Sequence, residues 1–169
     1  MSQVSLSSLP AGSRIQQAQA GADFADSYRL PSLKPGASAL EQFLMLSART
    51  PAWMNALMTL RNQAVLWVGL KDLGRMAAAV PRKPASAYRL GDRVGIFTLQ
   101  YADPDEVVLE DIDKHLHVQV SLFKQGADEL QLSTVVHIHN RLGHIYMSVV
   151  GPVHGVIVPL MLRQVGNVK

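Results

Sequence analysis

Histidines are the side chains of this sequence best suited to chemistry, and four of the six fall on two neighbouring segments. His115 and His117 alternate with apolar residues in KHLHVQVSLFK, and His137 and His139 do the same in ELQLSTVVHIHN. Alternation places each pair on the polar face of a strand, and the turn at 126–128 joins the strands as a hairpin. One register sets His115 beside His139 and His117 beside His137, close enough for neutral imidazoles to hold zinc or copper.

The alternative interpretation of this hairpin is a solvated sheet face carrying four unrelated histidines. No acid alternates beside the four to orient the rings, as a metal site would require. We therefore expect neither a metal ion nor another cofactor, and keep the four histidines as metal candidates of low priority.

His154 stands in a different setting, between Pro152 and Gly155 in a long uncharged segment, and is expected to face the interior. A histidine there could anchor a ligand carbonyl or act as a general acid or base, since its pKa lies near the operating range. The competing interpretation is a core histidine hydrogen-bonded to a backbone carbonyl. Tyr146, two turns earlier, has the same ambiguity, and the two residues are the catalytic candidates.

A pocket for an apolar ligand is the second expectation. Arg61 could pair with Asp111 or Asp113, or instead hold an anion or carboxylate at the mouth of a cavity. Aromatic side chains could line that cavity, although aromatic stripes also form ordinary cores. The predicted ligand-binding residues are Trp53, Arg61, Trp67, Phe97, Tyr101 and His154.

The elements that must position these residues follow from patterning. FADSYRL alternates as a first strand, Ser38 and Glu41 form a capping box that starts a helix, and Thr50-Pro51 starts a second helix that ends at Gly69. The irregular stretch 71–92 is a lid or a surface crossover. Further strands are predicted at 93–101, 106–112, 114–124 and 129–140, and a closing helix capped by Asn140 runs over 143–165.

From Ile145 to Leu162 the closing helix has no Lys, Arg, Asp or Glu, and a helix that is apolar all round must be buried. The order of elements predicts an α+β helix-grip domain, in which a curved antiparallel sheet wraps a long C-terminal helix, with two helices between the first two strands. We expect a flexible segment over 1–22 and one domain over 23–166.

Composition narrows the class of protein. The chain has 169 residues, 48% of them hydrophobic, and this length and composition are typical of a single globular domain. The net charge of +3 is scattered, so we expect no nucleic-acid partner. The absence of cysteine and of an apolar leader suits a cytoplasmic protein. Gly and Pro interrupt the closing helix, so we expect no membrane span.

Several runs resemble a bacterial family known as domain of unknown function 2867: ADFADSYRL, PAWMNALMTLRNQAVLWVGLK, RVGIFTLQ, DEVVLEDIDKHLHVQVSL, LSTVVHIHNRLGHIYM and GPVHGVIVPLMLR. The most specific phrases lie at 113–116, 139–143 and 152–154. The family is similar to the START or Bet v 1-like helix-grip superfamily of lipid carriers, polyketide cyclases and aromatases. Some relatives are fused to a nicotinamide-binding domain, which implies a nicotinamide-dependent oxidoreductase as partner.

Three positions depart from the family pattern. His117 stands where an acid is more usual and Gln119 where a base is, which removes an ion pair, and Val153 replaces an aromatic residue. From the resemblance, and from a closing helix that Pro and Gly keep from packing densely, we expect a binding module for a small hydrophobic or aromatic ligand, held between the sheet and the closing helix. The alternatives are a cyclase or isomerase that uses His154, and a non-catalytic interaction domain, such as a homodimer through a sheet edge.

Overall fold

The structure is a computed structural model that describes residues 4–54, 56, 59 and 83–166. Residues 52–54, 56 and 59 are helical, in agreement with a second helix after Pro51. The rest of that predicted helix lies outside the described residues, as do most of the predicted lid and the candidates Arg61 and Trp67.

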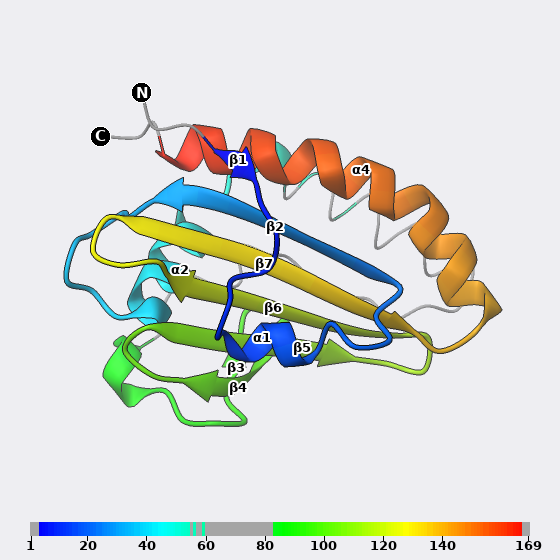
Figure 1. The fold of residues 1–169 in the computed structure, drawn as a ribbon, viewed down its shortest axis with the longest axis horizontal. Helices are drawn as coiled ribbons and strands as arrows, with labels where there is room; N and C mark the ends of the chain where they lie inside the picture. Colours follow the sequence, from blue (N-terminus) through cyan, green and yellow to red (C-terminus); the bar gives the residue numbers. More distant parts are fainter. Residues whose placement is uncertain (1–3, 55, 57–58, 60–82, 167–169) are drawn as a thin grey trace.

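A seven-stranded antiparallel sheet and a long C-terminal helix make up the fold (Figure 1). The strand order is β1-β2-β7-β6-β5-β4-β3, so the chain's second strand pairs with its last. The elements are β1 (Ser5–Leu6), α1 (Arg14–Gln17), β2 (Phe24–Pro31), α2 (Ala39–Ala48), η2 (Ala85–Ala87), β3 (Arg93–Val94), β4 (Phe97–Ala102), β5 (Glu106–Ile112), β6 (Leu116–Lys124), β7 (Glu129–Ile138) and α4 (Arg141–Gly166).

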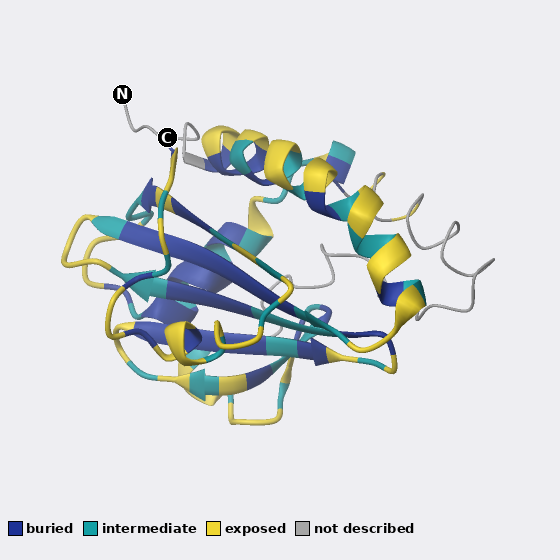
Figure 2. Cartoon of the chain, turned by 45° about the vertical axis from the view of Figure 1, so that its right-hand side comes forward, coloured by how far each residue is buried: buried dark blue, intermediate teal, exposed yellow. Residues whose placement is uncertain are grey.

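The two faces of the sheet differ in chemistry. The inner face is apolar and packs against α2 and the C-terminal half of α4, as the dark blue strands and α2 in Figure 2 indicate. The outer face is polar, and the N-terminal segment with α1 crosses it in Figure 1. Alternation along β6 and β7 sorts the side chains between these faces, since successive residues of a strand point to opposite sides. The core residues of the two strands are Val120, Leu122, Leu130 and Leu132.

Several sequence predictions are confirmed. Ser38 accepts a hydrogen bond from the backbone N–H of Glu41, and the Glu41 side chain accepts one from that of Ser38, which completes the capping box of α2. Asn140 Oδ1 accepts from the N–H of Gly143 at 3.1 Å and caps α4. The hairpin register places His117 opposite His137, as expected.

The prediction of a continuous strand over 93–101 needs correction, and two short elements were not predicted. The strand predicted over 93–101 is divided at Gly95, whose φ of 63° allows a tight turn between β3 and β4. The register of β4 against β5 then shifts between Leu99 and Tyr101, as a β-bulge does. Patterning missed β1 and α1 altogether, because both are short and polar.

The predicted burial of the closing helix on every side is wrong. One side of α4 packs on the sheet through Val158, Leu162 and Val165, but large apolar side chains on its other side are exposed (Figure 2). By length and composition α4 is also the one helix of the described residues that could cross a membrane. The sheet therefore carries the helix on its inner face, and wrapping of the sheet around it is not confirmed.

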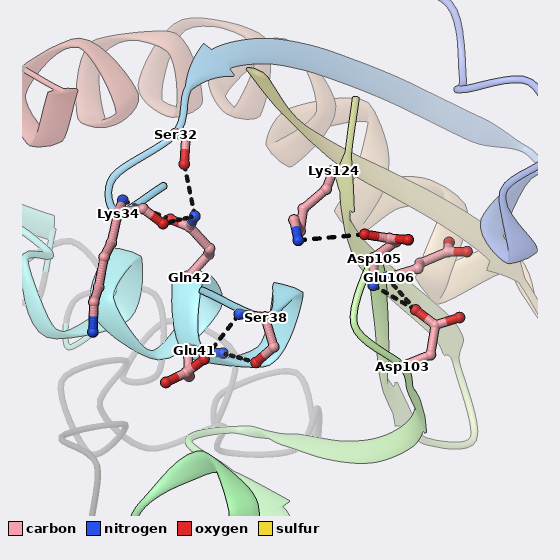
Figure 3. A network of polar contacts seen from close by, with 9 residues as sticks. All are labelled: Ser32, Lys34, Ser38, Glu41, Gln42, Asp103, Asp105, Glu106 and Lys124. Atoms are coloured by element: carbon pink, nitrogen blue, oxygen red, sulfur yellow. Dashed lines mark hydrogen bonds and ion pairs between the residues drawn. The ribbon is translucent and has the colours of Figure 1, made fainter. Parts of the chain in front are cut away.

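A buried glutamine ties α2 to β2 (Figure 3). Gln42 is fully buried, and its Oε1 accepts from the N–H groups of Leu33 and Lys34 at 3.0 and 3.2 Å. Its Nε2 donates to Ser32 Oγ and to the Lys34 carbonyl, both at 2.7 Å. The amide group of Gln42 thus makes four hydrogen bonds to residues 32–34, which fixes the path of the chain from β2 into α2.

The N-terminal strap, residues 4–22, lies against the sheet. Ile15 is buried, and the backbone N–H groups of Arg14 and Ile15 donate to the Glu106 carboxylate of β5 at 2.7 and 3.3 Å. Ser121 Oγ donates to the same carboxylate at 2.8 Å. The flexibility predicted for 1–22 stays a prediction, whereas Glu106 accounts for where the strap attaches.

We expect Glu106→Ala to lower the free energy of unfolding by about 2–3 kcal/mol, because three donors lose a charged acceptor in a buried place. Urea denaturation measures the loss, and limited proteolysis should show faster cleavage within the strap. Asp105→Asn is the matched control, since Asp105 is exposed and its ion pair with Lys124 contributes less than about 1 kcal/mol. Equal stability of Glu106→Ala and the wild type would contradict the attachment.

Gly143→Ala should destabilise the protein by about 2–3 kcal/mol, because a Cβ there would lie 2.7 Å from the backbone oxygen of His115 and from Ile138 Cγ2. Gly155→Ala on the same helix meets nothing within 4 Å and should be neutral, or stabilising by up to about 1 kcal/mol. Urea midpoints of the two variants test this. A Gly143→Ala protein as stable as Gly155→Ala would show that the corner can relax.

Candidate functional site

The candidate site lies where α4 approaches β2. Phe24, Asp26 and Tyr28 alternate along β2, and Tyr28 belongs to the inner core. On α4, Gly151 faces the Phe24 ring, and a Cβ at this position would make an ordinary van der Waals contact with it at 3.8 Å. His154 follows one turn later on the same side of the helix. The spacing of strand and helix thus brings Asp26 and His154 together.

Asp26 and His154 form a direct pair, with Nδ1 of the imidazole 2.9 Å from Oδ2 of the carboxyl group. The Asp26 side chain is only 9% exposed and that of His154 28%. An ionised carboxylate only accepts hydrogen bonds, so the geometry assigns a proton to Nδ1. The other ring nitrogen, Nε2, has no hydrogen-bond partner among the described residues.

The surroundings of the pair are unusual in two respects. Asp26 Oδ1 is buried and has no hydrogen-bond partner among the described residues, which is costly for a carboxyl oxygen. The His154 ring meets Phe24 edge to face, with centroids 5.7 Å apart at 88°. The imidazole is therefore held by a carboxylate on one side and an aromatic ring on another, and the second carboxyl oxygen of Asp26 has no hydrogen bond from a described residue.

Tyr28 shares the inner face with the pair. Burial, and to a smaller degree the neighbouring Asp26 carboxylate, raise the pKa of Tyr28 to about 12. Each effect disfavours the tyrosinate, because an anion loses hydration and meets a second negative charge. Tyr28 stays neutral over the whole physiological range and can act only as a hydroxyl group.

The predicted site residues divide between several places. Tyr146 lies two turns before His154, and the described contacts of His154 do not include it. Trp53 packs against the core and donates from Nε1 to Gln164 at 2.9 Å, and Phe97 also packs there. Tyr101 lies on the outer face, under the Arg14 guanidinium at 4.2 Å from the ring centroid. The bulge in β4 reverses the side-chain order, so Phe97 and Tyr101 do not share a pocket.

The four hairpin histidines also separate. His117 Nε2 lies 2.9 Å from Glu110 Oε2, so an acid that the sequence did not reveal orients this ring. Its centroid is 6.0 Å from that of His137. His115 is buried at the corner before α4, where Nδ1 lies 3.0 Å from Asn140 Oδ1. Within the described ranges no cluster of three or more His, Asp or Glu side chains is arranged to hold a metal ion.

A hollow of about 360 Å³ lies beside β2, under the N-terminal strap. Serine and glutamine side chains give it a polar character, and Asp26 is the residue that it shares with the His154 pair. Its lining residues are Ser7, Ser8, Leu9, Ala11, Gln16, Gln19, Ala25 and Asp26. A small molecule could approach this part of β2 from the hollow.

We expect Tyr28→Phe to remove one tyrosinate that titrates at about pH 12 in an ultraviolet titration of the folded protein. Since the folded pKa is above the unfolded value of 10.0, the stabilisation from neutral Tyr28 is complete below pH 10 and is lost as the pH rises towards 12. The alkaline fall in stability should accordingly be shallower in Tyr28→Phe. Tyr88→Phe is the control, and loss of the same late step in that variant would refute the assignment.

Comparison with known proteins places the chain in a family. No curated protein and no solved structure matches the sequence significantly. Residues 18–161 match the family described as "Protein of unknown function (DUF2867)". This range includes β2 through most of α4, and therefore both Asp26 and His154. The chain belongs to the DUF2867 family.

Proposed function

We propose that this domain binds a small, mainly apolar or aromatic organic molecule between the sheet and α4, with the Asp26–His154 pair as its polar anchor. The observation that carries the proposal is the pair itself, a carboxyl–imidazole contact of 2.9 Å set into an apolar inner layer. Ligand sites in proteins are mostly apolar and contain a few polar groups that fix orientation. Phe24 and Tyr28 supply aromatic surface beside the anchor.

The anchor can recognise a ligand in two ways. Nε2 of a neutral His154 accepts a hydrogen bond from a ligand hydroxyl, and the buried Asp26 Oδ1 accepts one from a ligand donor. A ligand hydroxyl or amine would satisfy an oxygen that is otherwise buried without a partner. The preferred ligand therefore has an apolar body and one hydrogen-bond donor.

The same geometry favours a second function, that of a general acid–base enzyme of the cyclase or isomerase type. A carboxylate on Nδ1 orients the imidazole and stabilises the imidazolium that forms when Nε2 takes a proton, as in other histidine–carboxylate pairs of enzymes. His154 would be the catalytic residue, and Asp26 the positioning residue. Tyr28 would contribute a neutral hydroxyl group, since its pKa is raised to about 12.

Three further expectations belong to the same proposal. The helix-grip relationship is supported by an antiparallel sheet with a long C-terminal helix on one face. A nicotinamide-dependent oxidoreductase as partner, and a cytoplasmic location, are supported by the family resemblance and by composition. A homodimer through a sheet edge remains the interaction-domain alternative.

Native and denaturing mass spectrometry of freshly purified protein tests the binding proposal. We expect an added organic mass of about 200–400 Da under native conditions, which is lost on denaturation. Asp26→Asn and His154→Gln should each retain about tenfold less of it, because a charge-assisted hydrogen bond is lost. Glu110→Gln is the matched control, since it alters an equally short histidine–carboxyl pair on the outer face. Equal retention by Asp26→Asn and Glu110→Gln would rule out the anchor.

The recovered molecule then separates binding from catalysis. Incubated with fresh wild-type protein, a ligand is recovered unchanged, whereas a substrate is converted. If conversion occurs, His154→Gln should slow it by about 100-fold or more, the usual contribution of a general acid or base. Conversion at the wild-type rate in His154→Gln would leave the binding role and remove the catalytic one.

A further inference from the structure

The outward side of α4 carries a continuous apolar stripe. Its five side chains recur at intervals of four, four, three and four residues, which keeps them on one side of a helix. Each is between 46% and 65% exposed. The stripe consists of Ile145, Val149, Val153, Val156 and Leu160.

Two arginines extend this line at its ends. Arg141 precedes Ile145 by four residues and Arg163 follows Leu160 by three, so both lie on the side of the stripe. The rise of a helix sets them about 33 Å apart. The whole of α4 contains no Asp or Glu, and the chain as a whole has a net charge of +3. The outward side is thus apolar along its length and cationic at both ends.

Core packing does not account for this composition. Only 22% of the most apolar 18-residue window of α4 is buried, whereas the core helix of a globular domain would be mostly buried. The inward side already has its partners in the sheet core and in Asp26. A stripe of this size is on the order of 500 Å², the size of the largest apolar patch on a typical monomeric protein, and such patches are often functional.

We propose that the outward stripe of α4 docks on an anionic lipid surface. The helix would lie in the plane of the interface, with its aliphatic side chains at the acyl boundary and Arg141 and Arg163 among the headgroups. It would not span the bilayer, because its inward side is held by the domain's core. Anionic headgroups complement both ends of the stripe at once.

A second copy of the chain fits the stripe less well. Two stripes together would bury about 1,000 Å², at the lower limit for a specific interface. Either helix direction would also bring cationic ends together: parallel pairing sets Arg141 beside Arg141, and antiparallel pairing sets Arg141 beside Arg163. Charge therefore favours the lipid surface over the homodimer.

Flotation with lipid vesicles tests this proposal in the full-length protein. We expect the wild type to bind vesicles of phosphatidylcholine with about 30% phosphatidylglycerol, more weakly at high salt, and to bind pure phosphatidylcholine poorly. The double variant Val149→Glu/Val156→Glu should bind about tenfold less. Arg141→Glu should also weaken binding, and an acid in the first turn does not harm the helix.

Leu90→Glu/Ile112→Glu is the matched control, because both residues are exposed apolar side chains away from α4. Its vesicle binding should match the wild type apart from the effect of two added charges, and circular dichroism checks the folding of every variant. Absence of binding by the wild type, or equal binding by the stripe and control variants, would overturn the proposal. A homodimer that Val149→Glu/Val156→Glu dissociates, without vesicle binding, would assign the stripe to a second copy instead.

Discussion

The corner between β7 and α4 is the constraint on which the rest of the structure depends. Gly143 lies so close to the His115 carbonyl and to Ile138 that a Cβ has no room, and Asn140 caps the helix from the same corner. This contact fixes the rotation of α4 about its own axis. His154 follows Gly143 by eleven residues, which is about three turns, and so faces the sheet as Gly143 does. Ile145 follows by two and faces away.

The two histidine–carboxyl pairs among the described residues show what distinguishes a candidate site from a structural contact. Both have a nitrogen–oxygen distance of 2.9 Å, and both histidines are about one quarter exposed. The Glu110 carboxylate of the outer pair has a second partner in Gln100. Asp26 is more buried and keeps an oxygen without a partner. An unsatisfied buried carboxyl oxygen costs free energy, and of the two pairs only Asp26–His154 contains one.

Patterning predicted those parts of the fold that repeat with a clear period or carry a cap. The capping box of Ser38 and the register of His117 with His137 are examples. Asp26 could have been found by the same reasoning, since in FADSYRL it occupies an inward position between Phe24 and Tyr28. An acid that points inward needs a polar partner in the core. His154 could have been proposed as that partner, because it lies in the segment 145–162, which has no Lys, Arg, Asp or Glu. The alternation of apolar and polar residues could not predict the bulge before Tyr101. The bulge depends on how β4 pairs with β5, and it moves the Tyr101 ring to the other face of the sheet.

The prediction from hydropathy that α4 is buried on every side was wrong for a physical reason. A helix that is apolar on all sides must leave water, but the sequence does not state whether protein or lipid replaces the water. The inward side is covered by the core, whereas no described part of the chain covers the outward side. Burial of one side requires no arginine at the helix ends, whereas a lipid surface does benefit from Arg141 and Arg163. We expect substitutions on the two sides to act additively, because His154 and the stripe lie on opposite sides of the helix. One helix with charges only near its ends thus carries the proposed ligand anchor on one side and the proposed lipid-binding stripe on the other.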